Sequence, residues 1–301
     1  MKLRWIHWTP RVAVAGILAA TVALVPTSGV RTFDTELVKI DYASDIDHPK
    51  NIVWVLAMGS DARRGELITR TRADAIQLIG VNLETGTGVV IGTPATRGFP
   101  SRDTAPTGST PRSTSGTAAD GQDGGELYGI DIDYALITGF SGFERMIQAI
   151  GGVTVDSALA FSDDNLPGRY KVGKNYVNGT RALNFGRMRH FLPAGDFDRS
   201  ANQGRLVKAI FSKVKAKQDV PGFFEAGMLA AVTELRTNLS PAELYRVGQL
   251  VRNVKPGKIR TCVLSGSIGT VGEASVVLPN VTAARALGED VRDDAKLDGP
   301  C

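Results

Sequence analysis

The chain has 301 residues, of which 43% are hydrophobic, so it can bury a sizeable core in one large domain or two small ones. Its 35 lysines and arginines against 31 aspartates and glutamates give a net charge of +4, spread along the chain. Because the sequence holds no basic run and no basic–aromatic interleaving, we do not expect nucleic-acid binding. Its 2 cysteines and 3 histidines argue against a Cys/His zinc site.

The N-terminal residues 1–30 are predicted to form a cytoplasmic tip and a transmembrane anchor. Lys2, Arg4 and Arg11 precede the uncharged residues 12–30, a run close to the roughly 20 residues that span a bilayer. A basic flank before an apolar run keeps the N-terminus in the cytoplasm and exports the remainder of the chain. A cleaved signal peptide is the alternative, although no clear Ala-x-Ala site comes after the run. We therefore expect a single-pass protein of the cell membrane, with residues 31–301 extracytoplasmic and residues 31–50 forming a stalk.

The predicted export affects the expected oxidation state of Cys262 and Cys301, the two cysteines of the chain. In an oxidising compartment a disulfide between them is the natural expectation. It would close a loop of about 38 residues and stabilise the fold by roughly 4 kcal/mol in the chain-entropy model. The alternative is two free thiols, with Cys301 fraying at the end of the chain.

Beyond the stalk, predicted strands and helices interleave, which indicates an α/β sandwich. Apolar runs predict strands, and amphipathic patterns bounded by capping residues and glycines predict helices. Residues 100–125 are rich in Ser, Thr, Gly, Asp and Pro and predict an exposed, mobile loop, either a lid or a tolerated insertion. The expected strands are 52–58, 75–82, 89–93, 134–138, 153–155, a short one around 262 and 275–279; the expected helices are 141–150, 180–188, 199–215, 223–235, 241–251 and 281–287.

Charged side chains gather where the first predicted strands end. Asp61 and Arg63 come after the first strand, Arg72 and Asp74 precede the second, and Arg97 comes after the third. Mg²⁺ takes one or two carboxylates and completes its octahedron with phosphate oxygens and water. The arginines would balance charge that develops on phosphorus and the leaving group. The pattern matches a site for a magnesium-bound pyrophosphate, whereas Asp61 and Asp74 taken individually are better explained as turn-forming or capping carboxylates.

A second group of charged residues lies between residues 184 and 203. Arg187 and Arg189 are two apart, so an extended backbone would direct both guanidiniums to one face. Asp196 or Asp198 can cap the next helix, and Arg199 and Gln203 then share one side of it. Paired guanidiniums beside a helix N-terminus suit a phosphate or pyrophosphate. A solvated, salt-bridged surface loop is the alternative.

Five motifs in order carry a family resemblance. They are Gly59-Ser60-Asp61-Ala62-Arg63; Arg72-Ala73-Asp74; Ile130-Asp131-Ile132-Asp133-Tyr134; Gly142-Phe143 with Ala149-Ile150-Gly151-Gly152-Val153; and Gly179-Thr180-Arg181-Ala182-Leu183-Asn184-Phe185-Gly186-Arg187-Met188-Arg189 with Asp196-Phe197-Asp198-Arg199 through Gln203. Over about residues 51–215 the chain thereby resembles the LytR-CpsA-Psr family of bacterial cell-envelope phosphotransferases. The tail with Cys262 and Cys301 is similar to that of actinobacterial members.

The resemblance implies an α-β-α sandwich with a mixed central sheet over residues 51–260, preceded by the transmembrane helix, with residues 261–301 as an extension packed on the domain. It implies a polyprenyl tail held in an apolar tunnel between sheet and helices. The implied reaction is transfer of a glycopolymer from polyprenyl pyrophosphate to a peptidoglycan hydroxyl, with Mg²⁺. By position, the catalytic residues would be Asp61 and Asp74, which hold the metal, with Arg187 and Arg189 on the phosphates. The substrate-binding residues would be Arg63, Arg72, Arg97, Arg199 and Gln203.

The chain departs from the family pattern after the third strand. The family's Ile-Pro-Arg-Asp motif stands here as Thr93-Pro94-Ala95-Thr96, without the arginine and the aspartate. Removing one preorganised donor from such a site costs on the order of a hundred- to thousandfold in rate. Arg97 is a candidate replacement. We expect a working but slow enzyme, and the alternatives are an impaired or non-catalytic polyprenyl-phosphate-binding envelope protein and a purely structural one.

Overall fold

The computed structural model describes residues 34–40, 51–62, 67–68, 73–94, 124–223, 235–271 and 274–301. All of them belong to one compact unit, Phe33–Cys301. The predicted anchor, residues 1–30, and the predicted loop up to residue 123 lie outside the described residues. Among the helices that the structure does describe, none combines the length and the apolar character of a membrane span.

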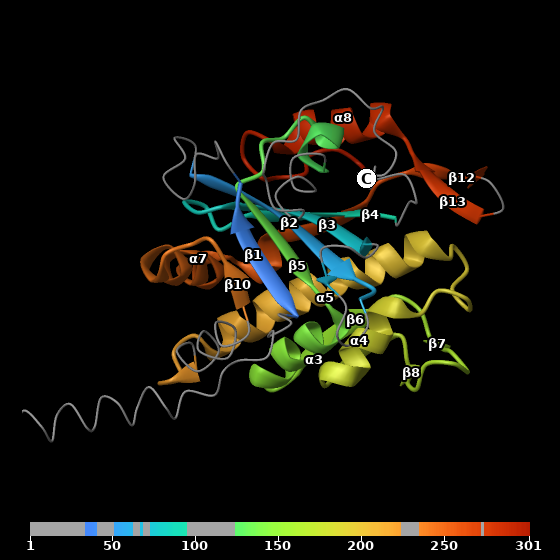
Figure 1. Ribbon diagram of the computed structural model, residues 1–301, viewed down its shortest axis with the longest axis horizontal. Coiled ribbons are helices and arrows are strands. Elements are labelled where there is room, and N and C mark those ends of the chain that lie inside the picture. The colour runs from blue at the N-terminus through green and yellow to red at the C-terminus, as the bar shows by residue number, and fades with distance from the viewer. Residues whose placement is uncertain are drawn as a thin grey trace, which may run out of the picture. The chain divides into compact units, whose positions relative to one another are not determined.

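A mixed seven-stranded sheet forms the centre of the unit, with strand order β10-β1-β5-β2-β3-β4-β11 (Figure 1). The antiparallel series β2-β3-β4 is flanked by β5, parallel to β2, and by β11, parallel to β4. Its strands are β1 (Thr35–Lys39), β2 (Ile52–Ser60), β3 (Ala73–Asn82), β4 (Gly88–Thr93), β5 (Tyr134–Thr138), β10 (Leu235–Thr237) and β11 (Ile259–Val263). The prediction of a mixed central sheet is confirmed.

Helices cover both faces of the sheet (Figure 1). One face carries α3 (Phe140–Ala149), α4 (Gly179–Arg187), α5 (Asp196–Lys217) and α7 (Pro241–Asn253), and the other carries α8 (Val281–Val291). Successive side chains of a strand point to opposite faces. Ile76 and Leu78 of β3 therefore pack in one core with Ala284 of α8, whereas Gln77 and Ile79 face the α5 side. A short 3-10 helix, Pro256–Lys258, leads into β11.

Three two-stranded ribbons flank the central sheet: β6 (Val153–Ser157) with β9 (Gly173–Val177), β7 (Phe161–Ser162) with β8 (Arg169–Tyr170), and β12 (Gly266–Val271) with β13 (Ala274–Pro279). The β7–β8 ribbon packs on α4 through a cluster of tilted and edge-on aromatic rings. The ring centroids of Phe161, Tyr170 and Phe185 lie between 5.0 and 5.4 Å apart. This packing fixes the β7–β8 segment beside the helix that carries Arg187.

Three sequence predictions need correction. The predicted stalk, residues 31–50, contains β1, which pairs with β5 and β10 because Val38 alternates into the core. The helix predicted over 223–235 cannot extend to its last residue, since Leu235 begins β10; residues 224–234 lie outside the described residues. The predicted boundary between residues 260 and 261 falls inside β11, so the C-terminal segment contributes a strand to the central sheet.

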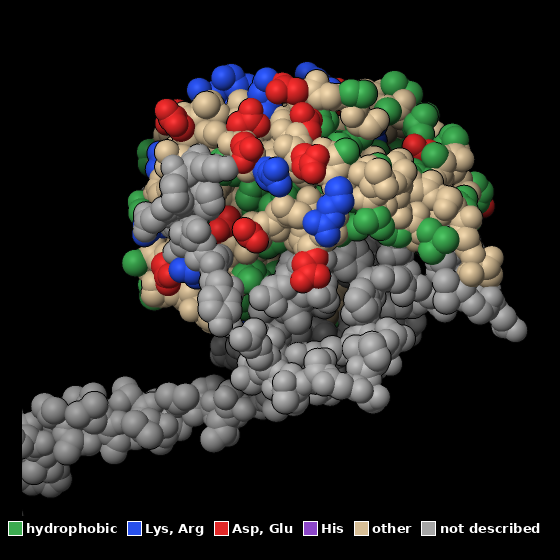
Figure 2. Space-filling model, turned by 90° about the horizontal axis from the view of Figure 1, so that it is seen from above, with side chains coloured by type: hydrophobic (Ala, Val, Ile, Leu, Met, Phe, Trp, Pro, Cys, Tyr) green, Lys and Arg blue, Asp and Glu red, His purple; other side chains and the backbone are tan. Residues whose placement is uncertain are grey.

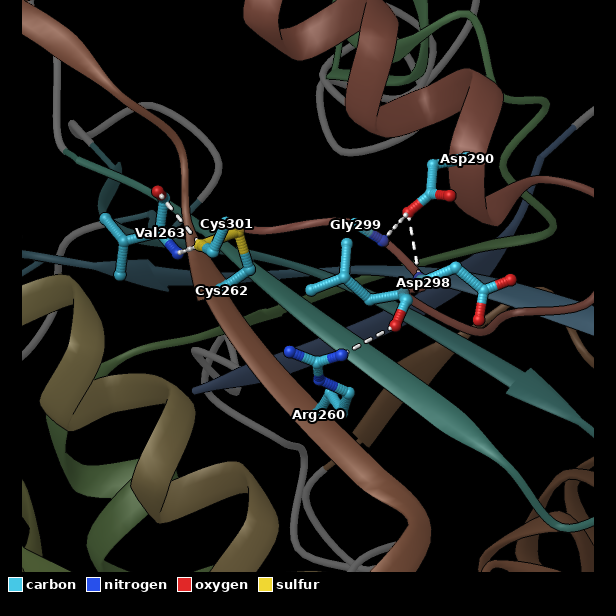
Figure 3. Close-up of a disulfide and its surroundings, with 8 residues drawn as sticks. Arg260, Cys262, Val263, Asp290, Asp298, Gly299 and Cys301 are labelled. Atoms are coloured by element: carbon cyan, nitrogen blue, oxygen red, sulfur yellow. Dashed lines mark hydrogen bonds between the residues drawn. A yellow bond between two sulfur atoms is a disulfide. The ribbon is translucent and has the colours of Figure 1, made fainter.

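The C-terminal segment is fastened to β11 by a disulfide between Cys262 and Cys301, whose Cα atoms are 5.4 Å apart (Figure 3). The Arg260 guanidinium donates to the Leu297 carbonyl oxygen at 2.9 Å. The Asp290 carboxylate accepts the backbone N–H groups of residues 298 and 299 at 3.1 and 3.3 Å. Seen from the α8 side, acidic and basic side chains are interspersed over the surface, as on a solvated face (Figure 2).

Candidate active site

A cavity of about 790 Å³ lies between the sheet and helices α3, α4 and α5. Alternation along the strands supplies its sheet side, because every second residue of β2, β3 and β5 points towards these helices. Its apolar lining includes Ala57, Ala75, Ile79, Leu136, Phe143, Met146, Leu206, Ile210 and Phe211. The position agrees with the apolar tunnel that the family resemblance implies.

Arg187 and Arg189 line this same cavity. Helix α4 ends at Arg187, and Met188 is extended, with φ −61° and ψ 130°, so the backbone between the two arginines is no longer helical. The Arg187 guanidinium lies 4.1 Å from the centroid of the Phe140 ring, a cation–π contact that orients it. Arg189 pairs with Asp196 at 3.4 Å. The two arginines therefore come together at the cavity, and both remain exposed to solvent.

Arg199 also lines the cavity, but it is buried and pairs with Asp196 at 2.9 Å. Helix α5 begins at Asp196, three residues before the predicted start. Neither candidate aspartate caps it: the N-cap residue is Gly195, whose φ of 53° favours glycine. The Asp198 carboxylate instead accepts the Ala194 backbone N–H at 2.8 Å. Both aspartates lie in the first helical turn, where the helix dipole favours negative charge.

Gln203 belongs to a chain of hydrogen bonds that joins the sheet to α4. Its Nε2 donates to the Gly186 carbonyl oxygen at 3.0 Å, and its Oε1 accepts from Gln77 Nε2 at 3.2 Å. Because a carbonyl can only accept, Gly186 sets the orientation of both amides. Gln77 is 3% exposed, and its Oε1 has no hydrogen-bond partner among the described residues. A Cβ at Gly92 would lie 2.3 Å from Ser200 Oγ, so this glycine permits α5 to approach the sheet.

Asp61 and Asp74 belong to the same end of the sheet. β2 pairs with β3 through Gly59↔Ala75 and then Ser60↔Ala73, so an irregularity leaves Asp74 without a partner residue. Asp61 comes directly after Ser60 and is partly buried. The side chain of Asp74 and the whole of Arg63, Arg72 and Arg97 lie outside the part of the chain that the structure describes. Within the described residues no cluster of three or more His, Cys, Asp or Glu forms a metal site.

Two carboxylate-bearing positions at one end of a sheet fit the requirements of Mg²⁺, since it takes one or two protein carboxylates and leaves its other positions to phosphate and water. Gly59 and Ala75, which pair at this end, also line the cavity. The backbone thus places the predicted metal-binding positions within two residues of Gly59 and Ala75, which line the cavity that carries the arginines.

A buried hydrogen bond joins the last residue of β4 to the residues that come after the segment containing Ala95 and Arg97. Thr93, the last residue of β4, bonds to the Tyr128 hydroxyl at 2.7 Å. Burial raises the pKa of Tyr128 to about 12. Tyr128 ends a helical turn over residues 124–128, so the bond ties together the two ends of the segment that holds Ala95 and Arg97.

Sequence reasoning missed several polar side chains that line the cavity, among them Gln77 and Asp163. Gln77 lies within an apolar strand, and nothing in the sequence marks its amide as buried. Asp163 is 8% exposed and lies in the segment between β7 and β8. Two-residue alternation was a usable signal, since Asp163 lies two positions after the buried Phe161.

Together, the fold and the site define a class of protein: an α/β sandwich with an apolar cavity that ends among arginines. Residues 124–290 match the model of the LytR_cpsA_psr family, and the chain belongs to this family.

Named relatives agree with the assignment. A polyisoprenyl-teichoic acid–peptidoglycan teichoic acid transferase TagU of Bacillus licheniformis is 31% identical over 222 residues, which cover 69% of this chain and 67% of the relative. A TagU of Enterococcus faecalis is 29% identical over 139 residues, or 46% of this chain and 44% of the relative. The chain thus matches less than half the length of that relative.

Solved structures show the same fold. The crystal structure of B. subtilis TagV superposes with a TM-score of 0.62 at 22% identity, covering 81% of this chain and 97% of that one. A structure described as TagT bound to LI-WTA gives a TM-score of 0.59 at 19% identity and covers 81% of this chain and 90% of that one. At these identities the likeness concerns the fold.

Proposed function

We propose that the chain is a membrane-anchored, extracytoplasmic phosphotransferase that attaches a glycopolymer from polyprenyl pyrophosphate to peptidoglycan. The observation that carries the proposal is the cavity of about 790 Å³, apolar along α3 and α5, with Arg187 and Arg189 in its lining. The names of the family's TagU relatives describe this type of transfer for a teichoic acid.

The two parts of the cavity suit the two parts of such a donor. A polyprenyl tail is apolar and gains roughly 25 cal/mol per Å² of surface removed from water. The pyrophosphate needs donors that remain charged at every physiological pH, and guanidiniums meet this need with paired N–H groups. The Phe140 ring holds the Arg187 guanidinium, which reduces the freedom that the side chain loses on binding.

Asp61 and Asp74 are the residues that would hold Mg²⁺. When bound, the ion would neutralise charge on the pyrophosphate and on the departing polyprenyl phosphate. The protein's own contribution is to keep these positions at one end of the β2–β3 pair, beside the cavity lining. Arg63, Arg72 and Arg97 are proposed as further phosphate-binding residues on their sequence positions alone.

The second candidate function is polyprenyl-phosphate binding without transfer. The observation that favours it is the replacement of the family's Pro-Arg-Asp by Pro94-Ala95-Thr96. Arg97→Ala separates the two: loss of transfer with intact folding would show that Arg97 supplies the missing guanidinium. In a chain that only binds, Ala95→Arg with Thr96→Asp should create transfer activity that the unmodified protein lacks.

The leading proposal is tested by Arg187→Ala and Arg189→Ala, with undecaprenyl phosphate as the probe in a binding assay. A charge-assisted bond to phosphate contributes roughly 1.5–3 kcal/mol, so each variant should bind about tenfold to a hundredfold more weakly. Arg145→Ala is the matched control, because Arg145 is an exposed helix arginine paired with Asp34 at 2.8 Å and does not line the cavity. Equal affinity in all three variants and the unmodified protein would reject the arginine pair as a phosphate site.

The proposed location has its own test. Residues 2–11 contain three basic side chains before the uncharged run, which orients the chain with its folded unit outside. Protease added to intact protoplasts should therefore digest the folded unit. Protection from the protease, or release of the protein by a high-salt wash, would contradict the assignment.

A further inference from the structure

Asp163 is a buried carboxylate to which the proposed metal and phosphate sites give no role. Its side chain is 8% exposed and lines the cavity that also carries Arg187 and Arg189. Among the described residues it is the single carboxylate in that lining. A carboxylate taken out of water is costly unless bonds or charges compensate for its lost hydration.

Two hydrogen bonds position the segment that carries Asp163, and one of them reaches the carboxylate itself. Asp163 Oδ1 accepts the Asn165 backbone N–H at 2.8 Å, which closes a local turn. The Asn184 amide, buried in α4, donates to the Pro167 carbonyl oxygen at 2.8 Å. Asn184 precedes Arg187 by three residues, so one helix positions both the carboxylate segment and the first arginine. Such preorganisation is a requirement for a reacting group.

Asp163 forms no ion pair with any residue in the part of the chain that the structure describes. The basic side chains that line the cavity with it are Arg187, Arg189 and His190 near the end of α4, and Arg199 on α5. The nearby acidic group Asp196 accepts both Arg189 and Arg199. These two arginines therefore have a carboxylate partner other than Asp163, whose second oxygen remains available to a ligand.

We propose that Asp163 is the general base that accepts the proton of the incoming peptidoglycan hydroxyl. This inference rests on the proposed function. In the step, the acceptor oxygen forms a bond to the phosphorus that carries the glycan, and the bond from that phosphorus to the bridging oxygen breaks. The bridging oxygen leaves as part of polyprenyl phosphate, and the hydroxyl proton passes to the Asp163 carboxylate and then to solvent.

The chemistry favours this assignment over the other cavity residues. Guanidiniums stay protonated and cannot accept a proton, and the amides of Gln77 and Gln203 are engaged in their hydrogen-bond chain. His190 is the competing base in the lining, but its side chain is exposed, whereas a positioned base works best when water is excluded.

The test compares Asp163→Asn with Asp164→Asn. The asparagine at 163 retains an oxygen for the Asn165 N–H, but it is uncharged and cannot take a proton. Asp164 is the adjacent, exposed carboxylate and serves as the matched control. His190→Gln completes the set. Each protein is assayed for undecaprenyl phosphate affinity and for transfer from a synthetic polyprenyl-pyrophosphate glycan to a peptidoglycan fragment, over a range of pH.

We expect Asp163→Asn to slow transfer by about a hundredfold to ten-thousandfold, the usual share of a general base, with lipid affinity unchanged. We expect the transfer rate of the unmodified protein to fall towards acid pH as the base becomes protonated, and this fall should disappear in the variant. Transfer that survives Asp163→Asn, equal loss in Asp164→Asn, or loss of the acid limb only in His190→Gln would overturn the inference. An unmodified protein that binds undecaprenyl phosphate but transfers nothing would overturn the proposed transfer function, and this inference with it.

Discussion

The Cys262–Cys301 disulfide should stabilise the fold chiefly by restricting the unfolded chain. The two cysteines are 39 residues apart in sequence, and for a loop of this size the chain-entropy model gives about 4 kcal/mol. Cys301→Ser is the least disruptive way to remove the bond, because Cys301 is exposed while Cys262 is buried at 4% exposure. The remaining Cys262 thiol behaves as a small apolar side chain.

The native tail keeps other attachments when the bond is removed. Leu297 is 2% exposed in the core and its carbonyl still accepts from Arg260, while Asp290 still holds the last turn (Figure 3). The folded state should therefore change little, and the loss should come from the unfolded state. For a unit of this size, about 4 kcal/mol corresponds to a melting temperature lower by roughly 8–16 °C.

The assay is thermal unfolding of the folded unit, Phe33–Cys301, monitored by circular dichroism with and without a thiol reductant. The reductant should lower the melting temperature of the unmodified protein to that of Cys301→Ser and leave the variant unaffected. Thiol labelling of unreduced, denatured protein should find no free cysteine. Equal melting temperatures for oxidised, reduced and variant protein would refute the reasoning, and so would two labelled thiols.

Two further predictions concern buried polar groups. Gln77→Met removes the donor to Gln203 Oε1 and should misplace α4, which we expect to lower the transfer rate by about tenfold to a hundredfold. Ile79→Met, two positions along the same face of β3, is the control and should leave the rate unchanged. Equal rates in both variants would contradict this prediction. Because burial raises the pKa of Tyr128 from 10.0 to about 12, the folded protein retains that proton longer than the unfolded chain, and stability should fall as pH rises through this window. Urea titrations between these pH values should show a smaller fall in Tyr128→Phe, and an identical fall would argue against the assignment.

Local patterns were sufficient for the elements with strong internal signals. The run Ile52–Met58, apolar on both faces, predicted a central strand, and β2 (Ile52–Ser60) lies between β5 and β3 in the sheet. Ser240, with Pro241 and Glu243 after it, begins α7 with a capping box, a signal that needs no distant contact. Elements of this kind are specified by residues that lie close together in the sequence.

Elements that depend on distant partners were misassigned. The segment 35–39 is short and contains the charged residues Glu36 and Lys39, so its sequence resembles a polar stalk. They become β1 because β5 and β10 supply hydrogen-bonding neighbours about a hundred and two hundred residues further along the chain. A strand of five residues has little local preference, and its stability comes from these pairings.

The site shows the same division between local and distant information. The order of the motifs located Arg187 and Arg189, but only the folded chain brings them to one cavity with Asp163. Asp163 and Asp164 are chemically identical neighbours, and the sequence offers no composition rule to choose between them. The folded chain distinguishes them: Phe161 packs inward on Phe185 of α4, and just after β7 Asp163 is buried whereas Asp164 is exposed. Position in the fold, and not chemistry, thus separates two equivalent carboxylates, and for this reason the Asp163→Asn and Asp164→Asn pair isolates position from chemistry.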